Sequence, residues 1–179
     1  MFDGEGSMSI EIRLARAEDA REICKIHAYS WYTTYINLLP IQLLEEKIKN
    51  YDTRIPMMEL LCKSANLYVL TFHQKIIGMI EIGESRDANF ASCGEIYALY
   101  LLKEYHWNGY GKQLFLFGIK ELLQRGYKEI ILNVLEGNKT IYFYEKLGGK
   151  IVGERIDVYQ NILLKEKIMY FENIEYLLK

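Results

Sequence analysis

The spacing of hydrophobic and polar residues predicts strands and helices that follow one another along the whole chain. Short β-rich runs, apolar at alternate or successive positions and bounded by turn-forming residues, indicate strands. The predicted strands cover residues 9–14, 67–72, 76–83, 95–102, 129–134, 150–158 and 165–172. Apolar residues that recur every three or four positions indicate amphipathic helices. The predicted helices cover residues 18–32, 40–48, 55–62, 109–125 and 139–147.

The order of these elements predicts the fold class. Strand 95–102, helix 109–125 and strand 129–134 form a βαβ unit, which is expected to be parallel and right-handed. A tight turn at residues 73–75 and the last two strands predict antiparallel hairpins. The predicted fold is therefore α/β (α+β), with a mixed, mostly antiparallel sheet of six to seven strands. We expect one domain over residues 8–179, preceded by a glycine-rich, polar leader at residues 1–7.

Composition narrows the classes of function. The chain has 179 residues, a net charge of −2 and a pI of about 6.0, which argues against a nucleic-acid binder that relies on phosphate contacts. Cys24, Cys62 and Cys93 are too far apart for a redox or metal CxxC motif, so free buried thiols are expected. No signal peptide or membrane span is apparent, and a cytoplasmic protein without a membrane partner is predicted.

The stretch of residues 94–122 carries the clearest chemical signal. Its sequence, GEIYALYLLKEYHWNGYGKQLFLFGIKEL, predicts a buried strand, a sharp turn with Gly109 and Gly111, and then a helix. Glycines let the backbone approach an anion, while free N–H groups and the helix dipole supply positive potential. The turn therefore predicts a site for a phosphate-bearing ligand. An ordinary strand-to-helix turn is the alternative.

This turn resembles motif A of the GNAT superfamily of N-acetyltransferases, (Q/R)xxGx(G/A) after a buried strand. The six motif positions are His106, Trp107, Asn108, Gly109, Tyr110 and Gly111, with His106 where the family usually has Gln or Arg. The later NKTIYFYEKLG resembles the family's N-x-x-A-x-x-(F/L)Y-x-x-x-GF segment. Here the spacing from Asn138 to Tyr144 is one residue shorter, and Gly149 replaces the usual Phe. HAYSWYTTY, at residues 27–35, resembles the HxxSWxxTY segment of a bacterial GNAT subgroup.

The resemblance implies an enzyme that moves an acetyl group from acetyl-CoA to a primary amine by direct attack, without a metal. It also implies a GNAT-like sheet that is splayed centrally, with helices on both faces. Pantetheine would lie along residues 99–101, with residues 133–135 opposite, and the pyrophosphate over residues 107–112. The implied cofactor-binding residues are Leu99, Tyr100, Leu101, His106, Trp107, Asn108, Gly109, Tyr110, Gly111, Lys112, Asn133 and Asn138. Asn138 can instead cap its helix.

Two residues are implied as catalytic. Glu95 lies fourteen residues before Gly109, the spacing of the base glutamate in the histone-type branch of the family. It could instead be a solvated glutamate that begins a strand, in which case water or another carboxylate, Glu81 first, would be the base. Tyr144 occupies the position of the general acid that protonates the departing thiolate. Alternatively, its ring packs and its hydroxyl satisfies a neighbouring group.

The acceptor is the least defined part of the prediction. Trp31 and Tyr35 could hold an ammonium by cation–π contact, or they could be core aromatics at helical spacing. Glu81, with Glu84, Asp87 and Glu95 nearby in sequence, favours a small cationic amine. Polyamine, aminoglycoside, protein N-terminus and small amino compounds stay open. So do a non-catalytic acyl-CoA-binding module, transfer of a longer acyl chain, and a homodimer formed through the apolar tail Ile174–Leu178.

Overall fold

The structure is a computed structural model, and it describes residues 10–179. The predicted leader and the first residues of the expected domain lie outside the described residues. The chain forms two compact units. We call them the N-terminal unit (residues 10–80 and 99–114) and the C-terminal unit (residues 81–98 and 115–179). The expected single domain over residues 8–179 stays a prediction.

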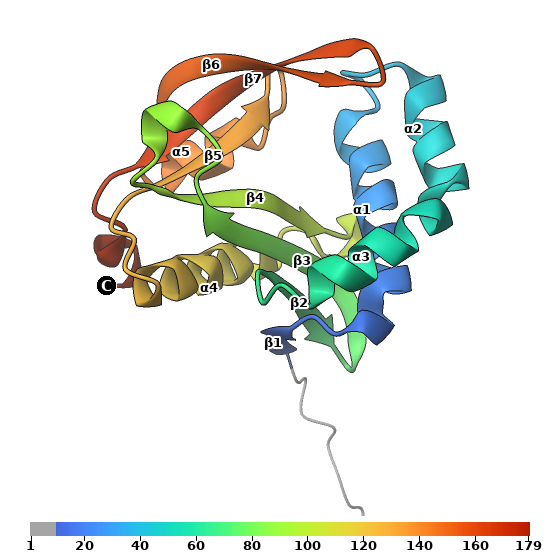
Figure 1. Ribbon diagram of the computed structural model, residues 1–179, viewed down its shortest axis with the longest axis horizontal. Coiled ribbons are helices and arrows are strands. Elements are labelled where there is room, and N and C mark those ends of the chain that lie inside the picture. Colours follow the sequence, from blue (N-terminus) through green and yellow to red (C-terminus); the bar gives the residue numbers. More distant parts are fainter. Residues whose placement is uncertain (1–9) are drawn as a thin grey trace, which may run out of the picture. The chain divides into compact units, whose positions relative to one another are not determined.

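The strands form a seven-stranded sheet in the order β1-β2-β3-β4-β5-β7-β6. The strands are β1 Ile10–Leu14, β2 Leu67–Phe72, β3 Lys75–Glu84, β4 Gly94–Leu101, β5 Ile130–Leu135, β6 Lys150–Tyr159 and β7 Ile162–Phe171. β4 and β5 are parallel, whereas β1–β2, β5–β7 and β6–β7 are antiparallel. The predicted mixed, mostly antiparallel α/β sheet is thus confirmed (Figure 1).

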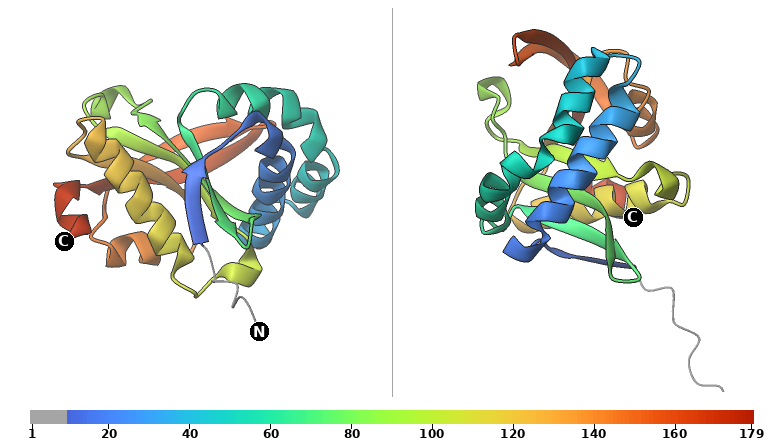
Figure 2. Two further views of the ribbon diagram at one scale, coloured as in Figure 1. Left: turned by 90° about the horizontal axis from the view of Figure 1, so that it is seen from below. Right: turned by 90° about the vertical axis from the view of Figure 1, so that its right-hand side faces the viewer.

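The N-terminal unit is built on three helices, α1 Ala20–Tyr35, α2 Ile41–Lys49 and α3 Ile55–Cys62. They pack together through their apolar faces and stay grouped in both views of Figure 2. Their buried side chains include Ile23, Ile26 and Leu44, which are almost completely excluded from solvent. Each helix begins and ends within three residues of its prediction, because the apolar spacing that predicted it is also what packs it.

The C-terminal unit has an aromatic core. Helix α4 (Tyr110–Gln124) enters this unit at Phe115, whose ring centroid lies 5.3 Å from that of Phe171 on β7 and 5.9 Å from that of Tyr144 on α5 (Ile141–Lys146). Gly149 follows α5, and a Cβ there would come within 2.6 Å of the Phe171 ring. The space that a Phe at position 149 would need is therefore filled by Phe171.

Within residues 10–179, five short 3-10 helices were not predicted; four lie between the main elements and one follows the last strand. They are η1 Ala17–Asp19, η2 Tyr51–Arg54, η3 Ala88–Phe90, η4 Lys103–Tyr105 and η5 Ile174–Leu178. η5 is the tail that was expected to contact a partner chain, but its first residue, Ile174, is fully buried within its own unit.

Three other expectations concern cysteines, membranes and metals. Cys24, Cys62 and Cys93 are free and buried, as predicted. Over residues 10–179, no helix is both long enough and apolar enough to cross a membrane. Within the same range, no three His, Cys, Asp or Glu side chains are grouped so that they could hold a metal ion.

Candidate functional site

The turn between β4 and α4 is held in shape by two of its own side chains. The carbonyl of Leu101 can only accept, so the His106 ring donates from Nε2 to it at 3.0 Å. The Asn108 amide donates to the carbonyls of Tyr105 at 3.3 Å and His106 at 3.0 Å. His106 therefore joins the turn to the end of β4. A polar side chain that donates to this carbonyl can serve there, which explains why His can stand in place of Gln or Arg.

The two glycines of the turn leave its surface open. Gly109 has a φ of +79°, a left-handed conformation that favours glycine. Gly111 has no such need, and a Cβ there would meet nothing within 4 Å. Packing within the protein therefore gives no reason for glycine rather than alanine at position 111. Space kept free for a ligand does give a reason.

The start of α4 supplies the donors for such a ligand. Its first N–H groups have no partner inside the helix, as at every helix start, and Gln113 donates back to the carbonyl of Gly109 at 3.0 Å. Trp107, just before the helix, has a φ of +67° and a fully exposed side chain. A bulky residue in the left-handed region is strained, and such strain clusters at functional sites. The turn fits a pyrophosphate.

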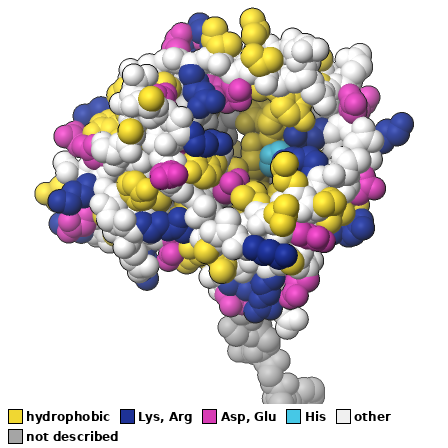
Figure 3. Space-filling model, viewed as in Figure 1, with side chains coloured by type: hydrophobic (Ala, Val, Ile, Leu, Met, Phe, Trp, Pro, Cys, Tyr) yellow, Lys and Arg dark blue, Asp and Glu magenta, His cyan; other side chains and the backbone are white. Residues whose placement is uncertain are grey.

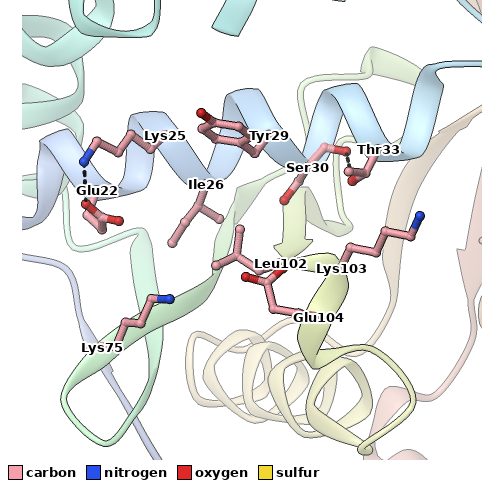
Figure 4. Close-up of a pocket in the computed structure, with 10 residues that line it drawn as sticks. All are labelled: Glu22, Lys25, Ile26, Tyr29, Ser30, Thr33, Lys75, Leu102, Lys103 and Glu104. Atoms are coloured by element: carbon pink, nitrogen blue, oxygen red, sulfur yellow. Dashed lines mark hydrogen bonds and ion pairs between the residues drawn. The ribbon is translucent and has the colours of Figure 1, made fainter.

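The cavity in Figure 4 lies beside the entry to this turn, within the N-terminal unit. It has a volume of about 270 Å³ and is bordered by α1, by Lys75 and by residues 102–104. Figure 4 shows Ser30 and Ile26 on α1 directed toward Leu102, and an ion pair between Glu22 and Lys25 at 3.3 Å. None of the predicted site residues lines this cavity.

The β5 strand offers a second feature that fits the cofactor. Three residue pairs join β4 to β5, the last being Ile96↔Leu132, after which β5 continues through Leu135. The next residue on β5 is Asn133, whose Oδ1 is buried. It is the only buried side-chain oxygen or nitrogen in residues 10–179 without a hydrogen-bond partner. Leaving such an atom unpaired costs about 1–3 kcal/mol. An amide N–H of pantetheine is a donor that would satisfy it.

The segment with Asn138 and Tyr144 is packed into the C-terminal unit. The Asn138 side chain is buried and accepts a hydrogen bond from the Thr140 N–H at 3.0 Å, which stabilises the start of α5. This contact favours the capping alternative. The Tyr144 ring packs on Phe115 and Phe143, with centroid distances of 5.9 and 5.1 Å. The cofactor contact of Asn138 and the acid role of Tyr144 stay predictions.

Glu95 is held by an arginine that the sequence did not indicate. Its side chain is 1% exposed and pairs with Arg86, which is 56% exposed. The Arg86 backbone N–H donates to Oε2 at 2.8 Å, while the guanidinium donates to Oε1 from Nη2 at 2.7 Å and from Nε at 3.3 Å. The pair fixes the loop of residues 85–93 onto β4. These contacts are sufficient to account for a buried glutamate at position 95 with a structural role. Its role as the base stays a prediction.

The predicted acceptor wall is an aromatic group in the N-terminal unit. The Trp31 indole N–H donates to the Tyr100 hydroxyl at 2.8 Å, and the Tyr35 ring meets Trp31 edge-on at 5.1 Å. The Lys47 ammonium lies 4.0 Å from the centroid of the Trp31 ring. The cation that contacts Trp31 is thus a lysine of this chain. Binding of an acceptor ammonium by Trp31 and Tyr35 stays a prediction.

Lys47 is buried and belongs to a basic group, with His27 and Arg54, that sequence analysis missed. Burial, followed by the charge of Arg54, lowers the pKa of Lys47 to about 7. Arg54 donates to Nδ1 of His27 at 2.7 Å, so the imidazole proton lies on Nε2. Burial, with Lys47 and Arg54 nearby, lowers the pKa of His27 well below its usual value. The available signal was that Lys47 follows Leu43 and Leu44 at helical spacing, on the apolar face of α2.

The C-terminal unit also holds carboxylates around Arg86. Glu81 is half-buried, and its negative charge raises the pKa of Arg86. Glu84 is exposed at the end of β3. Glu166 on β7 was missed, although it alternates with the buried Leu164 and Ile168 and so occupies an inward position. Elsewhere, acidic and basic side chains are interspersed over the face seen in Figure 3.

Comparison with known proteins identifies the family. The model of the acetyltransferase (GNAT) family matches residues 28–149. An uncharacterised N-acetyltransferase of Bacillus subtilis, YuaI, is 31% identical over 162 residues, covering 88% of this chain and 90% of that protein. Spermidine N(1)-acetyltransferase of Thermoplasma acidophilum is 30% identical over 150 residues, covering 80% of this chain and 90% of that protein.

A solved structure matches the fold. The crystal structure of PaiA N-acetyltransferase from Thermoplasma acidophilum in complex with coenzyme A has a TM-score of 0.73 and 27% identity. The match covers 92% of this chain and 99% of that chain. These similarities agree with the open turn at Gly109 and Gly111. The chain therefore belongs to the GNAT acetyltransferase family and is an N-acetyltransferase that uses acetyl-CoA.

Proposed function

We propose that this enzyme acetylates a primary amine of a small cationic molecule, by direct attack of the amine on acetyl-CoA. The observation that carries the proposal is the open turn at Gly109 and Gly111, which no packing within the protein requires at Gly111. The relative named as a spermidine N(1)-acetyltransferase supports an amine acceptor. The carboxylates of the C-terminal unit support a cationic one.

The cofactor contacts follow from the two features that fit it. The backbone of residues 107–112 would bind the pyrophosphate at the start of α4. In the C-terminal unit, the backbone of residues 133–135 would bind pantetheine, and Asn133 Oδ1 would accept one of its amide protons. Bound acetyl-CoA supplies the acetyl group as an activated thioester.

The residues of the chain must then move two protons. A base takes one proton from the acceptor amine, so that the nitrogen lone pair can form the amide bond. An acid protonates the thiolate that leaves, and Tyr144 is proposed for this step. Hydrogen bonding to the developing negative charge would already help, even before the proton is transferred. Glu95 is the base implied by the resemblance. Because Glu95 is paired with Arg86, another carboxylate could act as the base instead.

Calorimetry with acetyl-CoA, followed by a thiol-release assay, tests this proposal. The amine panel should contain spermidine, an aminoglycoside, a peptide with a free N-terminus and a neutral amino compound. We expect amine-dependent release of free thiol, fastest with the polycationic amines. Tight binding without turnover on the whole panel would contradict acetylation of these amines and support a binding module. A competition series of longer acyl-CoAs would expose a different donor, because such a donor would bind more tightly than acetyl-CoA.

A further inference from the structure

Glu166 lies on β7 at a position that is partly buried but still accessible to a ligand. It pairs with Leu135 on β5 and with Arg155 on β6. Its side chain is 19% exposed, so solvent and a small ligand can reach it. Glu95, by comparison, is 1% exposed, and both its oxygens already accept hydrogen bonds from Arg86.

The strand registers place Glu166 on the same face of the sheet as Glu95 and Asn133. Glu95 on β4 is opposite Ile131 on β5. Side chains alternate along a strand, so Ile131, Asn133 and Leu135 share one face. Glu166 is opposite Leu135 and joins that face, two residues or about 7 Å along β7 from the partner of Asn133. The buried cluster of Cys93, Ile131 and Ile168 lies on the same face.

The polar atoms on this face are incompletely paired. One oxygen of Glu166, Oε2, lies 3.2 Å from Nε of Arg155. Within residues 10–179, Asn133 Oδ1 has no hydrogen-bond partner, and the part-exposed Glu166 carboxylate has further lone pairs beyond the one that faces Arg155. A carboxylate oxygen and a carboxamide oxygen are therefore both available to accept protons from a nitrogen ligand.

The charges around Glu166 make its protonation sensitive to its surroundings. Burial raises the pKa of this carboxyl. The positive charges of Arg155 on β6 and Arg86 act to lower the pKa of Glu166, whereas the negative charges of Asp157 on β6 and Glu95 on β4 act to raise it. A general base works best when its pKa lies near the working pH, and a raised carboxyl pKa moves in that direction.

We propose that Glu166 is the general base for the acceptor amine, an assignment that rests on the proposed acetyl transfer to a primary amine. The carboxylate takes one proton from the ammonium form of the acceptor. The freed lone pair forms the nitrogen–carbon bond, and the carbon–sulfur bond breaks with its electron pair on sulfur. The thiolate receives a proton from the acid, and the second amine proton leaves to solvent. Glu95 then serves as the anchor of the loop of residues 85–93.

Three variants test the proposal through the pH–rate profile. Glu166→Gln should lower kcat by about 10²–10⁴-fold, leave acetyl-CoA affinity unchanged, and abolish the acidic limb of the profile. Arg155→Met should move that limb to higher pH, because the arginine charge lowers the pKa of Glu166. Asp157→Asn should move it to lower pH, because the aspartate charge raises the pKa of Glu166. If Glu166 is purely structural, Glu166→Gln should lower the stability of the enzyme and leave the acidic limb at the same pH. That result would overturn the proposal.

Glu154→Gln is the matched control. Glu154 is a carboxylate on β6 beside Arg155, and it pairs with Lys165 and Lys167. Alternation along β6 places it on the opposite face from Arg155. Its replacement should leave kcat and the acidic limb unchanged. A loss equal to that of Glu166→Gln would show that any carboxylate of this hairpin matters and would overturn the assignment to Glu166.

A titration that needs no turnover separates this proposal from the proposed function. The enzyme with ¹³C-labelled glutamate carboxyls is saturated with CoA, and the Glu166 resonance is assigned by its absence in Glu166→Gln. Added spermidine should shift this resonance and lower the apparent pKa of Glu166, because a nearby ammonium favours the carboxylate. An unmoved resonance overturns the proposal. If no amine is acetylated, the function fails, while this titration still decides whether an amine meets Glu166.

Discussion

Replacing Glu95 with glutamine should destabilise the enzyme more clearly than it slows the reaction. The carboxylate is fully buried and accepts three hydrogen bonds from Arg86. Glutamine has the same size, and its remaining carbonyl oxygen can still accept the Arg86 backbone N–H. The lost part is the ion pair with the guanidinium, and because Arg86 is 56% exposed, solvent weakens that pair. We therefore expect a loss of about 1–3 kcal/mol in the free energy of unfolding.

Thermal unfolding and steady-state kinetics on the same preparations measure both effects. In a chain of this size, each kcal/mol lowers Tm by about 2–4 °C. The kcat of Glu95→Gln should fall by less than about tenfold, well short of the 10²–10⁴-fold that removal of a positioned base costs. Glu172→Gln, an exposed carboxylate in the same unit, should change neither quantity. Removing Arg86 should cost less stability in the Glu95→Gln background than in the wild type. A normal Tm together with lost turnover would make Glu95 the base and refute this reasoning.

Three further changes test separate parts of the site. Gly111→Val should weaken acetyl-CoA binding at least about tenfold in calorimetry without a large fall in Tm, because its Cβ meets nothing in the protein, while Gln113→Val in the same helical turn should bind normally. Tyr144→Phe should lower kcat by about 10²-fold with acetyl-CoA affinity retained, and an unchanged kcat would show that the hydroxyl is structural. Lys47 has a folded-state pKa of about 7 against 10.5 when unfolded, so the unfolded chain binds more protons between these values and wild-type stability should rise with pH there. Lys47→Met should lack this rise in denaturant titrations between pH 7 and 9, and an identical slope in both proteins would contradict the low pKa.

The sequence was sufficient for the elements that depend on local pattern. α3 and β2 begin and end at the predicted residues, because apolar spacing both predicts and packs them. The turn of residues 73–75 appears as His73 and Gln74, both with positive φ. The 3-10 helices were missed because three to five residues carry no periodic signal.

The side-chain contacts of the site could not be predicted, because they join residues that no local sequence pattern relates. Glu95 could be selected by its spacing to Gly109, but no pattern pairs it with Arg86, nine residues earlier in a loop. Trp31 could be seen as a cation-binding aromatic, whereas the identity of its cation, Lys47, depends on how α2 packs on α1. Glu166 and Lys47 share a signal that could have been used: each is a charged residue at an inward position of an otherwise apolar pattern.

Product identification tests most directly whether this GNAT enzyme acetylates a primary amine. Wild-type enzyme is incubated with isotope-labelled acetyl-CoA and spermidine, alongside the other amines of the panel, and products are analysed by mass spectrometry and NMR. We predict one labelled acetyl group on a primary nitrogen of the amine, formed in equal amount to the released thiol. Thiol release that is the same with and without every amine, and no labelled amide, would contradict this activity.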